Sequence, residues 1–181
     1  MDYFIKQNEY IDISPEFNVF VIIMAEKIDL KMHEKLAKAC FNKTWELLDK
    51  SNRTSEEDNE MIHTVHASRY HWGVLVANKQ GTALNLQRGE WQIARVYTVL
   101  EREDPALYHA NLCLKITQEN KIGDFDLAFA HEAVARASAL AGNQEDYETH
   151  LKLAKEAGEK IKDKGDREYF FEDLNAGNWF V

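Results

Sequence analysis

Apolar side chains recur at helical spacing along most of the chain, and turn residues divide this pattern into segments. The first clear segment is 30–50, where apolar residues return every three or four positions. Further segments of the same kind follow at 56–78, 84–102, 105–119, 124–142 and 146–162, with a short one after Gly165. Polar or glycine-containing stretches typical of helix ends separate them. The pattern predicts an all-α protein of about six or seven helices.

Residues 1–28 stand outside this pattern as an N-terminal extension. The run 17–28, FNVFVIIMAEKI, is rich in β-branched residues and therefore favours a strand, yet the sequence offers no partner strand elsewhere. An unpaired strand cannot satisfy its own backbone hydrogen bonds. We interpret 17–28 as the run that leads into the first helix, with a strand as the alternative. Residues 29–181 are predicted to form one domain.

Several helix ends carry residues suited to capping. Thr54 or Ser55 precedes acidic residues and is predicted to cap the helix that follows. Gly81 suits a left-handed helix end. Asp104 precedes a proline and is predicted as the next N-cap. Asp124 opens a segment with alanine on all sides, which lets neighbouring helices pack closely around it.

The stretch 60–101 combines a strong helical pattern with several polar rings. On a helical wheel of about 100° per residue, one face of its first half is apolar, formed by Ile62, Val65, Trp72 and Val76. A neighbouring face carries polar rings and then small residues, namely His63, His66, Tyr70, Gly73 and Ala77. Because small residues let another helix approach closely, we predict that these rings lie in a semi-polar crevice.

Two of these histidines raise the question of a metal. Glu60 and His63 form an ExxH pair, a spacing that di-iron helical bundles use twice, but the sequence holds no second pair. A zinc site would need a further ligand beside His63 and His66. The fold would have to bring that ligand near, and the candidates are His71, His131 and Glu132. We interpret the histidines as interhelical hydrogen-bonding groups, and we predict no metal and no cofactor.

Trp91 and Arg95 lie one helical turn apart. In one interpretation the guanidinium stacks on the indole and is presented to a carboxylate or phosphate ligand. In the other, Arg95 pairs with an interior acid such as Glu132 or Asp126, because a buried cation needs a partner. We favour the interior pair.

Composition narrows the class of protein. The chain has 31 acidic and 22 basic residues, a net charge of −9, and no basic cluster with interleaved aromatics, which disfavours nucleic-acid binding. Cys40 and Cys113 lack metal-ligand or CxxC spacing, as expected for core residues of a reduced, intracellular protein. The start lacks a secretory pattern, and the apolar run 19–25 is far shorter than the roughly 20 residues that span a bilayer. We expect a cytoplasmic protein that does not bind membranes.

Paired helices recur with a period of about 40 residues, which indicates a solenoid of stacked, antiparallel helix–turn–helix pairs. The pairs 90–119 and 124–162 resemble tetratricopeptide repeats. In each, a second helix carries an aromatic residue followed by alanines: Tyr108 with Ala110, and Tyr147 with Ala154 and Ala157. The turn 142–146 is longer than in the standard repeat, and no closing proline follows either pair.

The chain as a whole also resembles a group of bacterial proteins of unassigned function. The resembling segments are NKTWELLDKSNRT, HASRYHWG, RGEWQIARVY, PALYHANLCL and GDFDLAFAHEAVARA. This second resemblance implies an architecture and no chemistry.

The resemblance to helical repeats implies a protein or peptide partner, bound in a concave groove lined by the first helix of each pair. The candidate groove residues are His63, His66, Tyr70, Trp91, Arg95 and His131. One alternative is a small-molecule- or metal-binding enzyme or sensor that uses the crevice of His63, His66 and Tyr70. Another is a homodimeric scaffold. The sequence holds no nucleotide-binding or hydrolase motif, so no catalytic residue is assigned.

Overall fold

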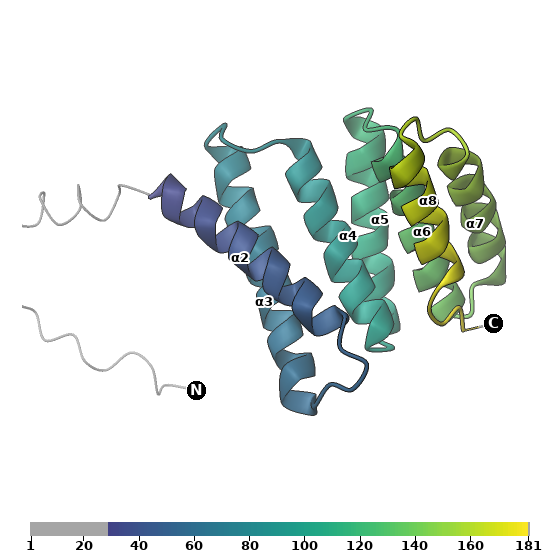
Figure 1. The fold of residues 1–181 in the computed structure, drawn as a ribbon, viewed down its shortest axis with the longest axis horizontal. Helices are drawn as coiled ribbons and strands as arrows, with labels where there is room; N and C mark the ends of the chain where they lie inside the picture. Colours follow the sequence, from purple (N-terminus) through teal and green to yellow (C-terminus); the bar gives the residue numbers. More distant parts are fainter. Residues whose placement is uncertain (1–28, 181) are drawn as a thin grey trace, which may run out of the picture.

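The computed structural model of the protein describes residues 29–180, and all regular secondary structure in this range is helical. Its seven helices are α2 (Leu30–Leu48), α3 (Ser55–Ala77), α4 (Ala83–Val99), α5 (Glu103–Glu119), α6 (Phe125–Leu140), α7 (Gln144–Gly158) and α8 (Lys164–Asn175) (Figure 1). The predicted all-α class and the predicted segments are confirmed. The run 17–28, for which strand and helix were alternatives, lies outside the described residues.

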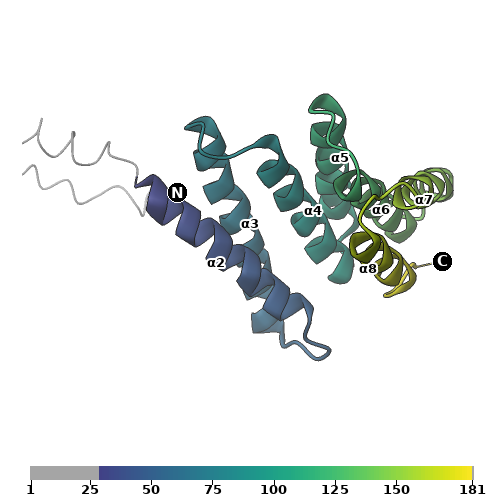
Figure 2. The ribbon, with the colours of Figure 1, turned by 45° about the horizontal axis from the view of Figure 1, so that its top comes forward.

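Consecutive helices pack as antiparallel hairpins, and the hairpins stack in chain order. The tightest packing joins α2 with α3, α4 with α5, and α6 with α7, while α8 lies against α6 and α7. Figure 2 shows this order, from α2 and α3 at one end of the stack to α7 and α8 at the other. The first helices also contact one another along the stack, because α4 packs on α6 and α6 on α8. This arrangement is a short helical-repeat solenoid.

The N-terminus of α3 has the predicted cap. The hydroxyl of Thr54 accepts a hydrogen bond from the backbone N–H of Glu57, and the Glu57 carboxylate accepts one from the backbone N–H of Thr54. This reciprocal pair satisfies two backbone donors that the helix leaves free. The predicted N-cap at Asp104 is wrong, since α5 starts two residues earlier, at Glu103, with Arg102 as its N-cap. Asp104 lies instead in the acidic first turn, where its negative charge interacts favourably with the positive end of the helix dipole.

The predicted left-handed helix end at Gly81 differs from the structure, whereas Asp124 opens α6 as predicted. Lys79, with φ of 60°, takes the left-handed conformation after α3 that was predicted for Gly81. Gly81 is required for space, because a Cβ there would lie 2.9 Å from the Val76 side chain. Asp124 is the N-cap residue of α6, but its carboxylate makes no bond to that helix. It accepts a hydrogen bond from the backbone N–H of Lys162, 3.1 Å away, and so ties the start of α6 to the segment between α7 and α8.

The buried face of α3 is rotated from the predicted one. Its fully buried residues are Met61, Val65, Ser68 and Leu75, whereas Ile62, Trp72 and Val76 are only partly buried. The centre of this face is polar, because the Ser68 hydroxyl donates to the backbone carbonyl of Ala37 at 2.9 Å. That contact brings α2 close to α3 at a residue that hydrophobicity alone assigns to the surface. Within residues 29–180, no helix combines the length and apolar content needed to cross a bilayer.

Candidate functional site

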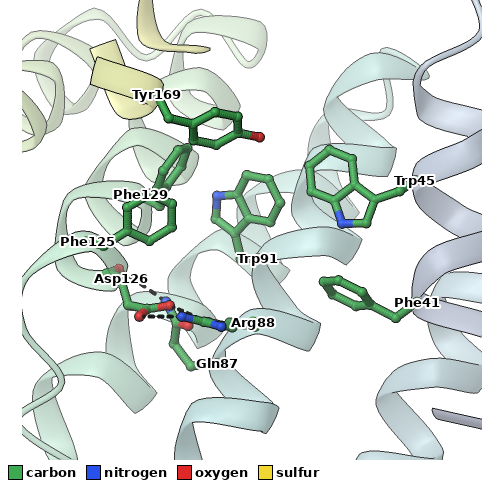
Figure 3. A pocket seen from close by; sticks show the side chains of 9 residues that line it. All are labelled: Phe41, Trp45, Gln87, Arg88, Trp91, Phe125, Asp126, Phe129 and Tyr169. Atoms are coloured by element: carbon green, nitrogen blue, oxygen red, sulfur yellow. Dashed lines mark hydrogen bonds and ion pairs between the residues drawn. The ribbon is translucent and has the colours of Figure 1, made fainter. Parts of the chain in front are cut away.

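An aromatic pocket lies on the face formed by the first helices. It has a volume of about 160 Å³ and is lined by Phe41 and Trp45 of α2, Gln87, Arg88 and Trp91 of α4, Phe125, Asp126 and Phe129 of α6, and Tyr169 of α8 (Figure 3). Helical spacing accounts for each wall: Phe41 and Trp45 are four residues apart, as are Phe125 and Phe129. We call this site the aromatic pocket.

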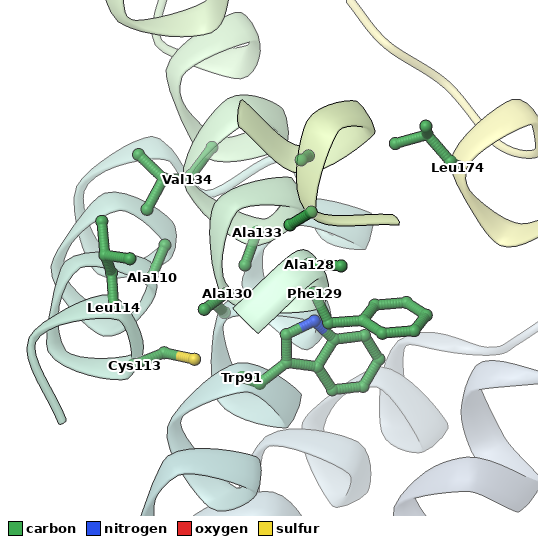
Figure 4. Packing of buried hydrophobic residues seen from close by; sticks show 14 of the residues in the cluster. Trp91, Ala110, Cys113, Leu114, Ala128, Phe129, Ala130, Ala133, Val134 and Leu174 are labelled. Atoms are coloured by element: carbon green, nitrogen blue, oxygen red, sulfur yellow. The ribbon is translucent and has the colours of Figure 1, made fainter. Parts of the chain in front are cut away.

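The aromatic rings form a continuous surface from α2 to α8. The Trp45 and Trp91 ring centres lie 5.6 Å apart, and Phe129 meets Trp91 edge-on at 5.5 Å. Tyr169 continues the row, 6.3 Å from Phe129 and 6.2 Å from Phe125. Trp91 and Phe129 also reach into the core, where they meet the alanines of α6 (Figure 4). The deeper wall of the pocket is thus part of the hydrophobic core, as expected for a preformed site.

One edge of the aromatic pocket is an ion pair between α4 and α6. Arg88 donates to both carboxylate oxygens of Asp126, at 2.7 and 3.0 Å. These hydrogen bonds raise the pKa of Arg88, so its charge is firmly held. Below the pair, the Gln87 amide donates to the backbone carbonyl of Asp126 at 3.2 Å and to the Sγ of Cys113 at 3.3 Å. The contacts fix α6 on α4 beside the pocket.

Behind the aromatic pocket lies a buried network of charges. Glu132 is fully buried and accepts from Arg95 at 3.0 Å and from Arg136 one turn along α6. Arg95 also donates to Asp173 of α8. Burial alone would lower the pKa of Arg95, but Glu132 and Asp173 outweigh it and raise that pKa.

The favoured interpretation of Arg95 as a partner of an interior acid is therefore confirmed for Glu132, while Asp126 pairs with Arg88 instead. The guanidinium carbon of Arg95 does lie 5.1 Å from the centre of the Trp91 ring. Its hydrogen bonds, however, point into the protein. Arg95 thus supports the pocket from behind.

The predicted crevice on α3 is wrong for two of its three polar rings. His63 is exposed and Tyr70 is 64% exposed, because none of the helices between residues 29 and 180 covers that part of α3. His66 is partly buried, and its Nε2 lies 2.9 Å from the Tyr97 hydroxyl of α4. All three residues belong to the second helix of the first hairpin, so none of them lines the aromatic pocket on the row of first helices.

His66 belongs to a polar cluster between α3, α4 and α5 that sequence reasoning missed. We call it the His66 cluster, and its members are His66, Arg69, Glu90, Tyr97 and His109. Glu90 is its centre: one carboxylate oxygen accepts from Arg69 at 2.7 Å, and the other lies 2.6 Å from Nδ1 of His109. The His109 ring lies 5.5 Å from that of His66. Glu90 and Tyr97 are seven residues apart and therefore share a face of α4. This spacing was the feature of the sequence that could have indicated the cluster.

Burial and neighbouring charges set the protonation of this cluster. Burial would raise the pKa of Glu90, but the hydrogen bonds from His109 and Arg69 outweigh it, so the pKa is lowered. The pKa of His66 is lowered by burial and then by His109. The Glu90 carboxylate is therefore held in its charged form beside the neutral imidazole of His66. This arrangement suits a structural role in which the cluster links three helices. In the described part of the chain, no three His, Cys, Asp or Glu side chains are grouped closely enough to hold a metal ion.

His131, the last candidate groove residue, faces α7 rather than the aromatic pocket. Its Nδ1 lies 3.1 Å from Nδ1 of His150. Burial, and then His150, lowers the pKa of His131 to about 4. The structure thus separates the candidate groove residues, and only Trp91 among them lines the aromatic pocket.

Comparison of the chain with known protein families, with curated proteins and with solved structures finds no match, so the geometry of these sites is the basis on which a function can be argued.

Proposed function

We propose that the chain is a binding module that holds a segment of a partner protein or peptide against the row of first helices, anchored in the aromatic pocket. The observation that carries the proposal is an aromatic surface that four helices build and leave partly open. Phe41, Trp45 and Phe125 are only partly buried, and Tyr169 is 51% exposed. An open apolar surface with a few polar groups at its edge is typical of a binding site.

The size of the aromatic pocket favours a peptide over a free small molecule. Pockets for drug-sized ligands enclose roughly 300–1,000 Å³. The aromatic pocket, at about 160 Å³, has room for one side chain of a longer ligand. The residues on either side of that anchor would lie along the exposed surfaces of α2 and α8.

The walls of the aromatic pocket are held in place before any ligand binds. The Arg88–Asp126 pair joins α4 to α6 at its edge, and the Arg95–Glu132 pair joins the same helices behind it. Because these contacts already fix the helices, little conformational entropy would be lost in ordering the site when a ligand binds, and little affinity would be lost with it.

A matched pair of tyrosine variants tests the proposal. Random peptides displayed on phage would be selected on the 181-residue chain and then measured against Tyr169→Ala and Tyr108→Ala. Tyr108 lies on α5, is 62% exposed and does not line the aromatic pocket. We expect the selected peptides to lose at least tenfold in affinity with Tyr169→Ala, about 1.4 kcal/mol, and to bind Tyr108→Ala like the wild type.

The tryptophans supply a second readout inside the aromatic pocket. Each of the four indole N–H groups gives one signal in a ¹H–¹⁵N spectrum. Bound peptide should shift the signals of Trp45 and Trp91, which line the pocket, and leave those of Trp72 and Trp179 unchanged. Selected peptides that bind Tyr169→Ala as tightly as the wild type, and leave Trp45 and Trp91 unshifted, would refute the proposal.

The alternative function, a small-molecule site, would now rest on the His66 cluster; for its metal form, the described residues offer no group of three ligand side chains. Its favourable feature is the hydrogen bond between Glu90 and His109, whose ring stacks on that of Tyr97 with centres 6.0 Å apart. A thermal-shift screen of metal-stripped protein against divalent metals and metabolites examines this alternative, since binding to the native state raises the melting temperature. A large shift that is lost in His66→Ala would favour it over peptide binding.

A further inference from the structure

Two carboxylates stand beside the walls of the aromatic pocket. Asp49 follows Trp45 by four residues at the end of α2, and Asp166 precedes Tyr169 by three residues on α8. Residues at these spacings share one side of a helix. Both aspartates are exposed, and within residues 29–180 neither has a Lys, Arg or His within ion-pair distance.

The arginines nearest the aromatic pocket are already neutralised. Arg88 donates to both oxygens of Asp126. Arg95 is shared between Glu132 and Asp173. Asp126 already pairs with Arg88, and Glu132 and Asp173 already pair with Arg95, whereas Asp49 and Asp166 form no ion pair among the described residues. These two carboxylates are therefore the groups beside the pocket walls that remain free to accept from a ligand. Burial is the largest cause of the raised pKa of the Tyr169 phenol; Asp173 raises that pKa further, Arg95 opposes it, and Asp49 adds a smaller rise.

Aromatic faces combined with carboxylates are the chemistry that binds an organic cation. A cation over the face of Trp or Tyr is attracted by the ring, and the attraction is strongest where water is excluded. Trp45 and Tyr169 offer ring surface at the mouth, and their helical neighbours Asp49 and Asp166 offer hydrogen-bond acceptors. The net charge of −9 adds a long-range attraction for a basic partner.

We propose that the anchor taken by the aromatic pocket is an arginine side chain of the partner peptide. Arginine fits better than lysine because its flat guanidinium stacks on aromatic rings while its N–H groups still reach carboxylates at the edge. This inference rests on the proposed function, since it names the side chain that such a partner would insert.

The test compares two peptides that differ only in charge. One has a single arginine between glycines and blocked termini, and the other has citrulline, which keeps the shape but is uncharged. Each is titrated into the ¹⁵N-labelled 181-residue chain while the Trp45 and Trp91 indole signals are followed. We expect the arginine peptide to shift both signals and to bind at least tenfold more tightly than the citrulline peptide.

The carboxylates are tested with a charge-matched control. Asp49→Asn/Asp166→Asn should reduce the preference for arginine over citrulline to less than threefold. Glu119→Gln/Glu156→Gln removes the same charge from exposed positions on α5 and α7 and should keep the full preference. Because net charge changes equally in both variants, a difference between them reports on the mouth of the aromatic pocket.

Three outcomes overturn the inference. Equal affinity of the arginine and citrulline peptides would show that the aromatic pocket takes a neutral side chain, and peptide binding would still stand. Loss of the preference in both double variants would show that net charge alone attracts arginine. Unshifted Trp45 and Trp91 signals up to the solubility limit of the arginine peptide would exclude the anchor. Peptide binding itself fails only if the phage-selected peptides leave these signals unshifted too.

Discussion

Glu132 of α6 accepts a hydrogen bond from Arg95 of α4 at 3.0 Å, at a point where its carboxylate has no exposure to solvent. Arg136 donates to the same carboxylate, and its guanidinium also donates to the backbone carbonyl of Asp173 on α8 at 2.7 Å. One buried anion therefore organises two cations and three helices directly behind the aromatic pocket. Because burying a charge is costly, its removal should have a large effect.

Loss of Glu132 should be among the most destabilising substitutions in the chain. Glu132→Ala leaves Arg95 and Arg136 buried without their shared anion, and breaking a buried pair in this way costs about 3–5 kcal/mol. Urea unfolding measures the free energy of unfolding. Glu119→Ala, which removes an exposed carboxylate near Lys115, is the control and should change it by less than about 0.5 kcal/mol. A Glu132→Ala protein as stable as that control would contradict this account.

Gly158 allows α8 to pack on α7. A Cβ at this position would lie 2.7 Å from Cδ1 of Phe170, a fully buried ring. Gly158→Ala should therefore force the ring or α8 to move, at a cost of about 1–3 kcal/mol. Gly123→Ala is the matched control, because a Cβ there meets nothing within 4 Å. Thermal unfolding of the two variants should differ clearly, and equal melting temperatures would show that α8 adjusts without cost.

The stability of the fold should fall on acidification because of His131. Its pKa is lowered from 6.5 to about 4 in the folded protein, by burial and then by His150. Between these values the unfolded chain binds more protons than the native one, so the free energy of unfolding decreases as pH falls from about 6.5 to about 4. After solvent screening is taken into account, the contribution of His131 is on the order of 1–2 kcal/mol.

Urea unfolding at about pH 7 and about pH 4.5 measures this dependence. His131→Gln keeps a polar side chain that does not titrate, so it should reduce the loss of stability between the two pH values. His63→Gln removes an exposed histidine and should retain the wild-type dependence. Identical pH profiles for wild type and His131→Gln would show that other groups dominate the acid response.

The features that could be predicted depend on residues close together in the chain. The reciprocal cap of Thr54 and Glu57 follows from a spacing of three, and the helical segments follow from apolar repetition. The Arg95–Glu132 pair was predictable for another reason. Both residues lie in strongly apolar helical segments, where an ion needs an interior partner.

The aromatic pocket could not be predicted in this way. Phe41, Trp45 and Tyr169 come from opposite ends of the described chain and meet only because the hairpins stack and α8 folds back on α6. His109 was missed for the same reason, since its partners Glu90 and His66 lie on other helices. Ser68 shows a different limit of prediction from sequence. Its hydroxyl donates to a backbone carbonyl of the neighbouring helix, so it occupies a buried position where hydrophobicity alone would predict an apolar residue.

The two cysteines should differ sharply in reactivity. Cys113 is fully buried between α4 and α5, where burial and then Glu90 raise the pKa of its thiol, and Gln87 donates to its Sγ. The pKa of Cys40 is raised by burial alone, and this residue is partly exposed. Since the thiolate is the reactive form, a thiol reagent should modify Cys40 in the native protein and Cys113 only after unfolding.

Reaction with a coloured disulfide reagent measures both rates. In Cys40→Ser, the single remaining thiol should react at the rate of global unfolding, and should therefore react faster in Glu132→Ala, whose native state is less stable. In Cys113→Ser, the rate should be insensitive to Glu132→Ala, because Cys40 lies on α2, away from the buried network. Fast native-state labelling of Cys113 would mean that α5 separates locally from α4, and the wall that Gln87 gives the aromatic pocket would then be mobile rather than preformed.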